Sequence, residues 1–210
     1  MYVPPQFREE RADVLHAAIR ELRLAALATS RPDGVSVTHL PMLLREENGE
    51  LVLEGHVAIQ NEHWRTVGPS VAIFRGPHAY ISPGWYESKR AHGKVVPTWN
   101  YVAVHVHGQL EAVKDGVWLS RHLDALTDTH ETSQAHPWRT SDAPADFITN
   151  LQRAIVGLRM KVERIEGAWK MIQHRSAGDR LGAIEGLASA SVPGAADVAQ
   201  VMRELEAQRS

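Results

Sequence analysis

The sequence contains no cysteine, which excludes disulfide bonds, thiol catalysis and cysteine-ligated zinc sites. No apolar run approaches the length of a membrane span. The first ten residues, MYVPPQFREE, also lack the apolar core of a signal peptide. We therefore expect a cytoplasmic protein without a membrane partner, and the bacterial cytosol is the default location.

Neither sign of charge dominates, since 23 lysines and arginines stand against 25 aspartates and glutamates and the net charge is −2. This balance argues against a dedicated nucleic-acid-binding protein, which usually carries a basic domain or stripe. No G-x-G-x-x-G or P-loop pattern follows a strand, and G-x-S-x-G is missing, which disfavours dinucleotide-binding, P-loop and α/β-hydrolase folds. A chain of 210 residues with 43% hydrophobic residues is long enough for one large domain with appendages.

Short apolar runs separated by turn residues predict six or seven mostly antiparallel strands. The runs cover 24–30, 35–44, 51–57, 70–76, 78–83, 101–113 and 159–166, with a break expected at Gly76-Pro77. Helical periodicity predicts helices over 8–23, 145–157, 177–189 and 195–208. A further helix is predicted from about Asp115, with Leu119, Leu123 and Leu126 facing inward. The polar stretches 84–94 and 131–144 are predicted loops. We therefore expect an α+β fold on a small antiparallel barrel, with residues 1–210 as a single domain and 178–210 as a C-terminal helical appendage.

The stretch VPTWNYVAVHVHG, residues 96–108, concentrates polar and aromatic side chains on one face of a strand. Alternation places Val102, Val104 and Val106 on the opposite, core-forming face. The imidazoles of His105 and His107 stand side by side, as in some metal sites, but they also suit an ordinary solvated sheet face. No second histidine motif completes a ligand set, so we predict no metal.

Polar clusters also occur at the ends of predicted strands, in Thr38–Pro41, Glu54–Asn61 and Ala168–Ser176. A proline cannot donate to a strand ladder, so Pro41 indicates a sheet edge or bulge. His56 is expected beside a helix start, where free backbone N–H groups suit a phosphate. Each cluster also has an ordinary interpretation as surface, capping or turn residues. Together they offer the cations, amides and flat apolar walls that a phosphate-bearing ring ligand requires.

Seven segments spread along the chain resemble the PaiB-type FMN-binding negative transcriptional regulator family. These segments are MYVPPQF, THLPMLL, EGHVAIQNEHW, FRGPHAYISPGWY, VPTWNYVAVHVHG, IVGLRMKVERIEG and QHRSAGDRLGAIEGL. The resemblance implies the split β-barrel fold of pyridoxamine phosphate oxidase-like flavoproteins, antiparallel and Greek-key-like, with flanking helices. It also implies a homodimer that binds FMN at the subunit interface.

The resemblance and the strand-end clusters together define the predicted cofactor-binding residues. They are His39, Leu40, Pro41, His56, Val57, Ala58, Asn61, Trp99, Asn100, Tyr101, Lys170, Gln173 and Arg175. The chain departs from the family pattern at Gln6, Ala168, Ile172 and His174, where the family usually has histidine, lysine, serine and asparagine. The phosphate is expected near Gly55–Asn61 and Lys170–Arg175. No residue declares itself as a catalytic acid or base, so enzymatic activity is left open.

Three functions remain in competition. The first is a flavin-dependent redox protein, in which the flavin carries the chemistry and the protein positions it. The second is a regulator of transcription that binds DNA, with 179–188 and 195–208 as the best helix-turn-helix candidate, although its second helix is not basic. The third is a haem-binding or haem-utilisation protein, since related split barrels serve haem utilisation and the chain has 12 histidines.

Overall fold

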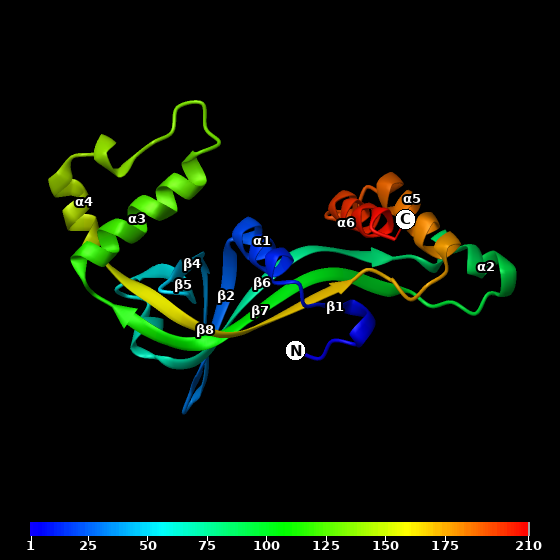
Figure 1. Ribbon diagram of the computed structural model, residues 1–210, viewed down its shortest axis with the longest axis horizontal. Helices are drawn as coiled ribbons and strands as arrows, with labels where there is room; N and C mark the ends of the chain where they lie inside the picture. The colour runs from blue at the N-terminus through cyan, green and yellow to red at the C-terminus, as the bar shows by residue number, and fades with distance from the viewer. Residues whose placement is uncertain (210) are drawn as a thin grey trace. The chain divides into compact units, whose positions relative to one another are not determined.

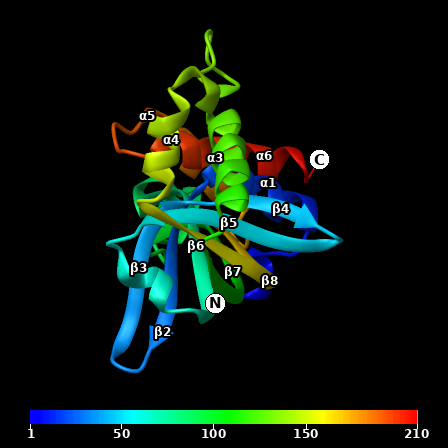
Figure 2. The same cartoon turned by 90° about the vertical axis from the view of Figure 1, so that its left-hand side faces the viewer.

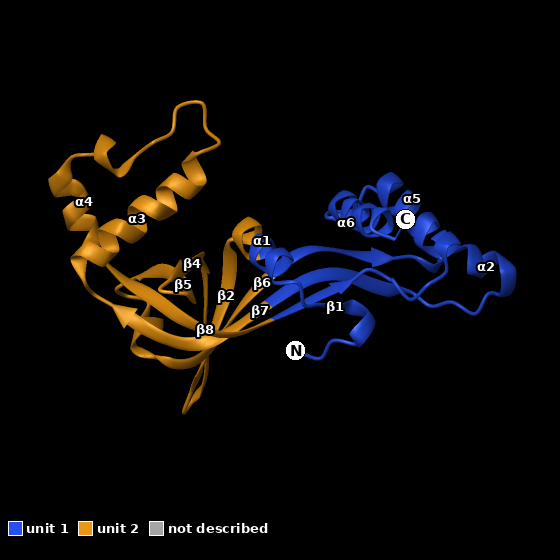
Figure 3. Ribbon diagram, viewed as in Figure 1, with its two compact units in different colours: residues 1–18, 75–104, 166–210 blue, residues 19–74, 105–165 orange. Residues whose placement is uncertain are grey.

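The computed structural model describes residues 1–209, and its strands form one antiparallel sheet (Figure 1). The strand order is β3-β2-β6-β7-β8-β5-β4, and the short strand β1 (Arg8–Glu9) pairs with β8. Contacts divide the chain into two compact units (Figure 3). Unit 1 comprises Met1–Ala18, Arg75–Val104 and Glu166–Ser210, and unit 2 comprises Ile19–Phe74 and His105–Ile165. The long strands β6 (Gly68–Ile81), β7 (Thr98–Val113) and β8 (Ile155–Lys170) supply residues to both units.

Unit 2 is built from consecutive hairpins. Its shorter strands are β2 (Leu24–Arg31), β3 (Gly34–Pro41), β4 (Leu43–Glu47) and β5 (Glu50–Ala58). Strand β2 pairs antiparallel with β3, and β4 pairs antiparallel with β5. Strand β5 also pairs antiparallel with β8. Helices α3 (Gly116–Glu131) and α4 (Ala145–Gln152) lie side by side beyond β5 (Figure 2). Alternating burial along β2, with Ala25 and Leu27 fully buried, shows that one face of each strand fills the core.

Unit 1 packs its helices on the other parts of the long strands. These elements are η1 (Pro5–Phe7), the start of α1 (Ala12–Leu22), η3 (Pro83–Trp85), α2 (Glu87–His92), α5 (Ala177–Ser189) and α6 (Ala195–Ala207). Ile81, Tyr86, Met171, Leu187 and Met202 belong to one buried cluster. In α5, a Cβ on Gly186 would lie 2.3 Å from the Trp85 ring, so the missing side chain admits the indole.

The valine face of β7 is confirmed, because Val102, Val104 and Val106 are buried while His105 and His107 on the other face are half-buried. The two imidazole rings lie 6.3 Å apart. The edge expected from Pro41 is also confirmed, since β3 stands at one end of the strand order and ends at this proline. The predicted helices over 177–189 and 195–208 match α5 and α6.

Several predicted boundaries are wrong for identifiable reasons. The helix expected over 8–23 begins at Ala12, because Arg8 and Glu9 pair with β8 instead. The helix expected over 145–157 ends at Gln152, because Ile155 already pairs with Ala58. The last strand extends beyond 159–166 in both directions.

The break expected at Gly76-Pro77 does not occur, since β6 runs from Gly68 to Ile81 without interruption. Pairing of β6 with β2 ends at Phe74, so Pro77 lies where that neighbour no longer requires an N–H donor. The predicted loop 84–94 contains α2, which ends at Gly93 with a φ of 70°. Tyr86 in this segment is only 1% exposed. The polar residues around it in the sequence do not reveal this burial.

Within residues 1–209, no helix is both long and apolar enough to span a membrane.

Candidate functional site

The end of β8 in unit 1 carries a lysine that is surrounded by other predicted site residues. Lys170 Nζ donates hydrogen bonds of 2.9 Å to Thr98 Oγ1 and to the Trp99 carbonyl oxygen. The ammonium lies 5.7 Å from the centre of the Tyr101 ring, and burial lowers the pKa of Lys170. An ammonium has three N–H donors, so one remains for a ligand. The fold thus brings Lys170 next to Trp99 and Tyr101, which are distant from it in the sequence.

The loop 171–176 follows this lysine and is shaped by its own glutamine. Gln173 Oε1 accepts a 2.8 Å hydrogen bond from the Met171 N–H, and Gln173 Nε2 donates to the Trp169 carbonyl oxygen. Ile172 is 1% exposed and has a φ of 53°, which is uncommon for a β-branched residue. The side-chain amide of Gln173 is therefore engaged in closing the loop.

Arg175 provides a second cation in the same loop. Its guanidinium carbon lies 4.9 Å from the centre of the Tyr86 ring, and Nη1 lies 3.8 Å from the buried Asp179 carboxylate. The Nε atom of Arg175 is buried and has no hydrogen-bond partner within residues 1–209. A buried donor without a partner is costly unless a ligand or water satisfies it. Arg175 Nε and the third N–H of Lys170 are therefore two cationic donors without a protein acceptor within residues 1–209.

The departures from the family pattern fall in different surroundings. Ala168 and Ile172 are each 1% exposed and belong to the interior of unit 1, so larger polar groups there would alter packing. Gln6 is exposed, and His174 packs edge-on against Phe7 with ring centres 5.5 Å apart. Burial, together with the charges of Arg175 and Lys170, lowers the pKa of His174. The free cationic donors of Lys170 and Arg175 remain despite these changes.

In unit 2, the absence of a side chain at Gly55 lets β5 pass close to the THLP segment. A Cβ on Gly55 would lie 2.9 Å from Leu40 Cδ1 and 3.0 Å from the Pro41 carbonyl oxygen. The predicted groups around 39–41 and 56–61 are therefore neighbours. Leu40 and Val57 are buried, whereas His39, Pro41 and Ala58 are exposed.

The helix start expected beside His56 is not found, because His56 lies within β5 and the next helix is the four-residue η2 (Glu62–Arg65). Asn61 already caps that turn, accepting a 3.1 Å hydrogen bond from the His63 N–H. The imidazole of His56 shares a 3.1 Å hydrogen bond with His122 Nε2. Burial lowers the pKa of His56, so the ring is a neutral partner of α3 and not a cation.

His122 is buried at 0% exposure and was not predicted. It stacks on Trp118 with ring centres 5.1 Å apart and 14° between the planes. Burial is the largest cause that lowers the pKa of His122 to about 3, and the positive charges of Arg45 and Arg121 act in the same direction. The predicted inner face of α3 includes Leu123 and Leu126, but His122 is more deeply buried than either. Helical periodicity could have placed His122 beside Leu119, but it does not supply the histidine partner on β5.

The carboxylate of Glu54, the first residue of the predicted polar cluster Glu54–Asn61, is buried in unit 2. It is 0% exposed and accepts a 2.9 Å hydrogen bond from Arg121 Nη2, with Arg45 Nε 3.7 Å away. Burial raises the pKa of Glu54. On the adjacent strand, the Arg159 side chain lowers the pKa of Glu47, which it contacts at 2.9 Å. This network joins β4, β5, β8 and α3.

A second unpredicted network fixes the turn after β5. His63 is 2% exposed, and its two ring nitrogens each lie 2.9 Å from a threonine hydroxyl, Thr38 Oγ1 on one side and Thr29 Oγ1 on the other. Thr29 Oγ1 lies 2.7 Å from Ser70 Oγ, and Asn61 Nδ2 donates to Thr38 Oγ1 over 3.2 Å. The side chain of Asn61 is therefore used to hold the turn against β3.

Replacing Gly157 with alanine should lower the free energy of unfolding by about 1–3 kcal/mol. A Cβ there would lie 2.3 Å from Trp118 Cζ3, and the indole cannot retreat without disturbing its stack on His122. Gly116→Ala is the matched control, because no atom lies within 4 Å of a Cβ at that position. Urea denaturation measures both variants. Equal stability of Gly157→Ala and the wild type would contradict the tight packing of Trp118.

The predicted cofactor residues fall into two groups, one in each unit. Unit 1 contains Trp99, Asn100, Tyr101, Lys170, Gln173 and Arg175. Unit 2 contains His39, Leu40, Pro41, His56, Val57, Ala58 and Asn61. Asn100 is buried, and its Nδ2 donates to Met202 Sδ over 3.4 Å. Their role in binding a cofactor stays a prediction.

Comparison with known proteins places these features in context. Residues 1–164 match the family described as "Putative FMN-binding domain". The chain is 30% identical over 207 residues to the protease synthase and sporulation protein PAI 2 of Bacillus subtilis, and the match covers 97% of both chains.

Solved structures share the fold at low sequence identity. The flavocytochrome Anf3 from Azotobacter vinelandii matches with a TM-score of 0.57 and 11% identity, over 78% of this chain and 69% of that one. The FAD and heme binding protein from Mycobacterium smegmatis matches with a TM-score of 0.56 and 13% identity, over 84% and 79% of the two chains. The expected α+β split-barrel fold with flanking helices is confirmed.

Proposed function

Because the chain belongs to the PaiB-type family of FMN-binding domains, we propose that it is a flavoprotein that binds FMN. The observation that carries this proposal is the donor set of Lys170 and Arg175, two cations with N–H groups that no protein atom within residues 1–209 accepts. A phosphate of about two negative charges leaves water favourably only if cations or oriented N–H groups meet it. The ring of Tyr101 supplies flat apolar surface beside Lys170.

Bound flavin supplies hydride or one-electron chemistry, and the chain's own residues hold and orient it. In unit 1, Lys170 neutralises phosphate charge, while Arg175 is restrained by Tyr86 and Asp179. In unit 2, the neutral pair His56–His122 and the His63 network give the segments after β5 a fixed conformation. The protein acts either as a redox protein or as a regulator of transcription through its flavin.

We also propose a homodimer with FMN at the subunit interface. Trp99 and Tyr80 are 49% and 46% exposed, and Trp99 stacks against His78 with ring centres 5.9 Å apart. Large exposed aromatic side chains gathered on one surface are typical of interaction sites. This surface belongs to the same unit as Lys170.

Size-exclusion chromatography of the purified protein, with light scattering and a visible absorption spectrum, tests the proposal. The expected result is a flavin spectrum that co-elutes with a particle of two chains after incubation with FMN. A spectrum typical of haem would favour the alternative ligand. A protein that retains no flavin after incubation would contradict the proposed function.

The chain alone is expected to show no strong sequence-specific DNA binding. The net charge is −2, and the second helix of the best helix-turn-helix candidate, α6, carries Asp197, Glu204 and Glu206 against Arg203. Such a helix attracts phosphates weakly. Electrophoretic mobility shifts with genomic fragments measure this property. A salt-dependent shift at nanomolar protein with a defined operator would show that the chain contacts DNA directly.

A further inference from the structure

Helices α3 and α4 and the loop between them, residues 115–153, form an insertion between β7 and β8 that we call the α3–α4 hairpin (Figure 2). The two helices contact each other, and Gln152 Nε2 donates a 2.9 Å hydrogen bond to Ser120 Oγ. Little of the hairpin is buried, since Leu119 and His122 are the only buried residues among 115–153. One turn of α3 therefore provides most of the attachment of the hairpin to the sheet of unit 2.

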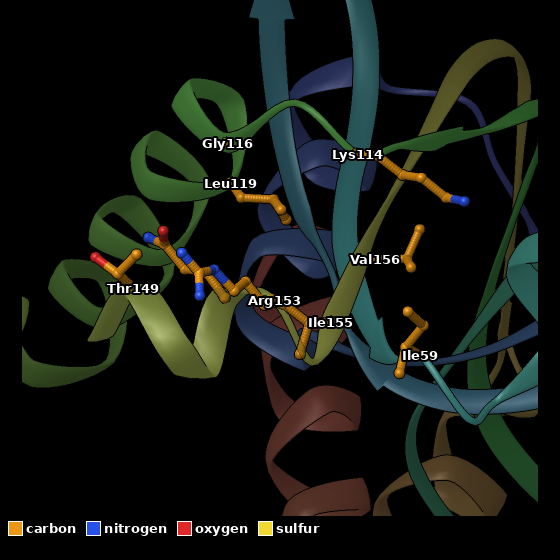
Figure 4. A pocket seen from close by; sticks show the side chains of 9 residues that line it. Ile59, Lys114, Gly116, Leu119, Thr149, Arg153, Ile155 and Val156 are labelled. Carbon is orange, nitrogen blue, oxygen red and sulfur yellow. The ribbon is translucent and has the colours of Figure 1, made fainter. Parts of the chain in front are cut away.

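Apolar contact between the hairpin and the sheet is limited. Leu119 is 4% exposed, and Val156 at the start of β8 is 1% exposed. Both line a pocket of about 330 Å³ that lies between the two helices, the start of β8 and the segment after β5 (Figure 4). Lys114 and Arg153 lie on opposite sides of its apolar wall (Figure 4). Open space thus interrupts the packing of the hairpin on the sheet, which lowers the free energy needed to separate them.

The other buried residue of the hairpin, His122, attaches α3 to β5. Its Nε2 lies 3.1 Å from His56 Nδ1, and its ring stacks on Trp118 with ring centres 5.1 Å apart. Two neutral imidazoles can share this hydrogen bond, because one nitrogen carries a proton and the other accepts it. Two imidazolium rings cannot, because both nitrogens are then donors.

The second nitrogen of His122 also has no acceptor for a proton. His122 Nδ1 is buried and has no hydrogen-bond partner within residues 1–209. Protonation of the buried ring would therefore place a positive charge and an unpaired N–H in the interior of unit 2. Exposure of the ring to water removes both costs.

The charged groups on the elements around the histidine pair contact one another. They are Arg45 and Glu47 on β4, Glu54 on β5, Glu111 on β7, Arg121 on α3 and Arg159 on β8. Arg121 contacts Glu54 at 2.9 Å and Glu47 at 3.2 Å. No carboxylate within residues 1–209 pairs with either histidine, and the positive charges of Arg45 and Arg121 oppose a further positive charge at His122.

These surroundings keep both histidines neutral while the hairpin is attached. Burial is the largest cause that lowers the pKa of His122 to about 3, and burial also lowers the pKa of His56. Once exposed to water, a histidine has a pKa of about 6.5. The detached hairpin therefore binds protons that the attached hairpin excludes, so acid favours detachment. Glu54 opposes this in part, because burial raises its pKa and its protonation favours the attached state.

We propose that acid detaches the α3–α4 hairpin from β5 and β8 below about pH 6, while the strands of unit 2 remain paired. The strands remain because their side chains pack on one another and their backbones are bonded. Leu27 on β2 and Leu53 on β5 are 0% exposed. Strand β2 pairs with β3 and β6, and β5 pairs with β4 and β8. Detachment exposes Leu119 and the apolar wall of the pocket to solvent.

Hydrogen–deuterium exchange with mass spectrometry tests the proposal on the purified full chain at pH 7 and pH 5, with each rate divided by the chemical exchange rate at that pH. The protection of amides in 116–131 should fall by about 25-fold. This factor follows from a histidine whose pKa is 6.5 when exposed and about 3 when buried. Amides of β2 should remain more protected than those of α3 at both pH values, because the hairpin opens without the strands.

Two variants assign the effect to His122. His122→Gln should reduce the fall in protection of α3 to the contribution of His56. His136→Gln changes an exposed histidine in the loop of the same hairpin, and it should keep the full fall. The comparison of α3 with β2 in the wild type stands by itself if His122→Gln does not fold.

Equal protection of α3 at pH 7 and pH 5 would overturn the proposal. Equal protection of α3 and β2 at pH 5 would overturn it as well, because the hairpin would then open only with the whole unit. A fall in His122→Gln as large as in the wild type would show that His122 is not the responsible group. Flavin enters none of these measurements, so failure of FMN binding refutes the proposed function and leaves the hairpin result intact.

Discussion

Lys170→Ala is expected to weaken FMN binding by about ten- to a hundredfold. The loss of a charged hydrogen bond to phosphate costs roughly 1.5–3 kcal/mol, which corresponds to this change in affinity. Lys170 is the cation with the clearest free donor, since two N–H groups are already bound to Thr98 and Trp99. Quenching of flavin fluorescence during titration measures the dissociation constant.

The experiment requires a check on structure, because Lys170 also holds the start of β7 through those two contacts. Circular dichroism and thermal denaturation establish whether the variant remains folded. Lys89→Ala, in an exposed position on α2, is the matched control and should bind FMN like the wild type. If the wild type binds FMN and folded Lys170→Ala binds it equally well, the phosphate does not lie at Lys170.

Arg175→Ala should have a smaller effect than Lys170→Ala. Asp179 is 1% exposed and lies 3.8 Å from the guanidinium, so part of the charge of Arg175 is already balanced. This ranking of the two cations is itself a test of the donor arrangement.

The second large effect is a loss of stability as the pH falls below 6.5. His122 is buried and neutral in the folded protein, and its pKa is lowered from 6.5 to about 3. A histidine with a lowered pKa in the folded state contributes stability above its unfolded pKa, and this contribution is lost as the pH falls towards the folded pKa. When the unfolded state binds one proton more than the folded state, the free energy of unfolding changes by about 1.4 kcal/mol per pH unit. The loss due to His122 should reach about 2 kcal/mol by pH 5.

Neighbouring groups modify this dependence in known directions. Burial also lowers the pKa of His56 and of His63, so both add to the loss of stability at acidic pH. Glu54 acts in the opposite sense, because burial raises its pKa and protonation therefore favours the folded state. The clearest interval is therefore between pH 6.5 and 5, above the ordinary range of carboxylates.

Urea denaturation at a series of pH values measures this effect. His122→Gln should reduce the slope by about one proton between pH 6.5 and 5. His136→Gln, which changes an exposed histidine in the loop after α3, is the matched control and should keep the wild-type slope. An unchanged slope in His122→Gln would show that this histidine is not buried as a neutral group.

Local patterns in the sequence were sufficient for most of the fold. The alternation of Val102, Val104 and Val106 identified the core face of β7, because side-chain direction in a strand is set by the backbone period of two. Pro41 marked an edge strand, and Asp115 marked the start of α3, where its carboxylate accepts a 2.7 Å hydrogen bond from the Trp118 N–H. The family motifs added the prediction that these strands form a split barrel. The predicted ends of two helices were wrong, because Arg8 and Ile155 pair instead with strand residues that are distant in the sequence.

Only the tertiary structure decided which polar side chains face one another. His56 looked like a phosphate donor at a helix start, but α3 supplies His122 as its partner across the core of unit 2. Glu54 belongs to a predicted polar cluster at a strand end, but only the fold shows that it is buried and bound by Arg121 on α3. The sequence by itself determined the type and order of most helices and strands, because these depend on backbone geometry and neighbours in the chain. It did not determine ionisation, hydrogen-bond partners or the pocket beside Lys114 and Arg153, because burial and electrostatic interactions depend on residues that only folding brings together.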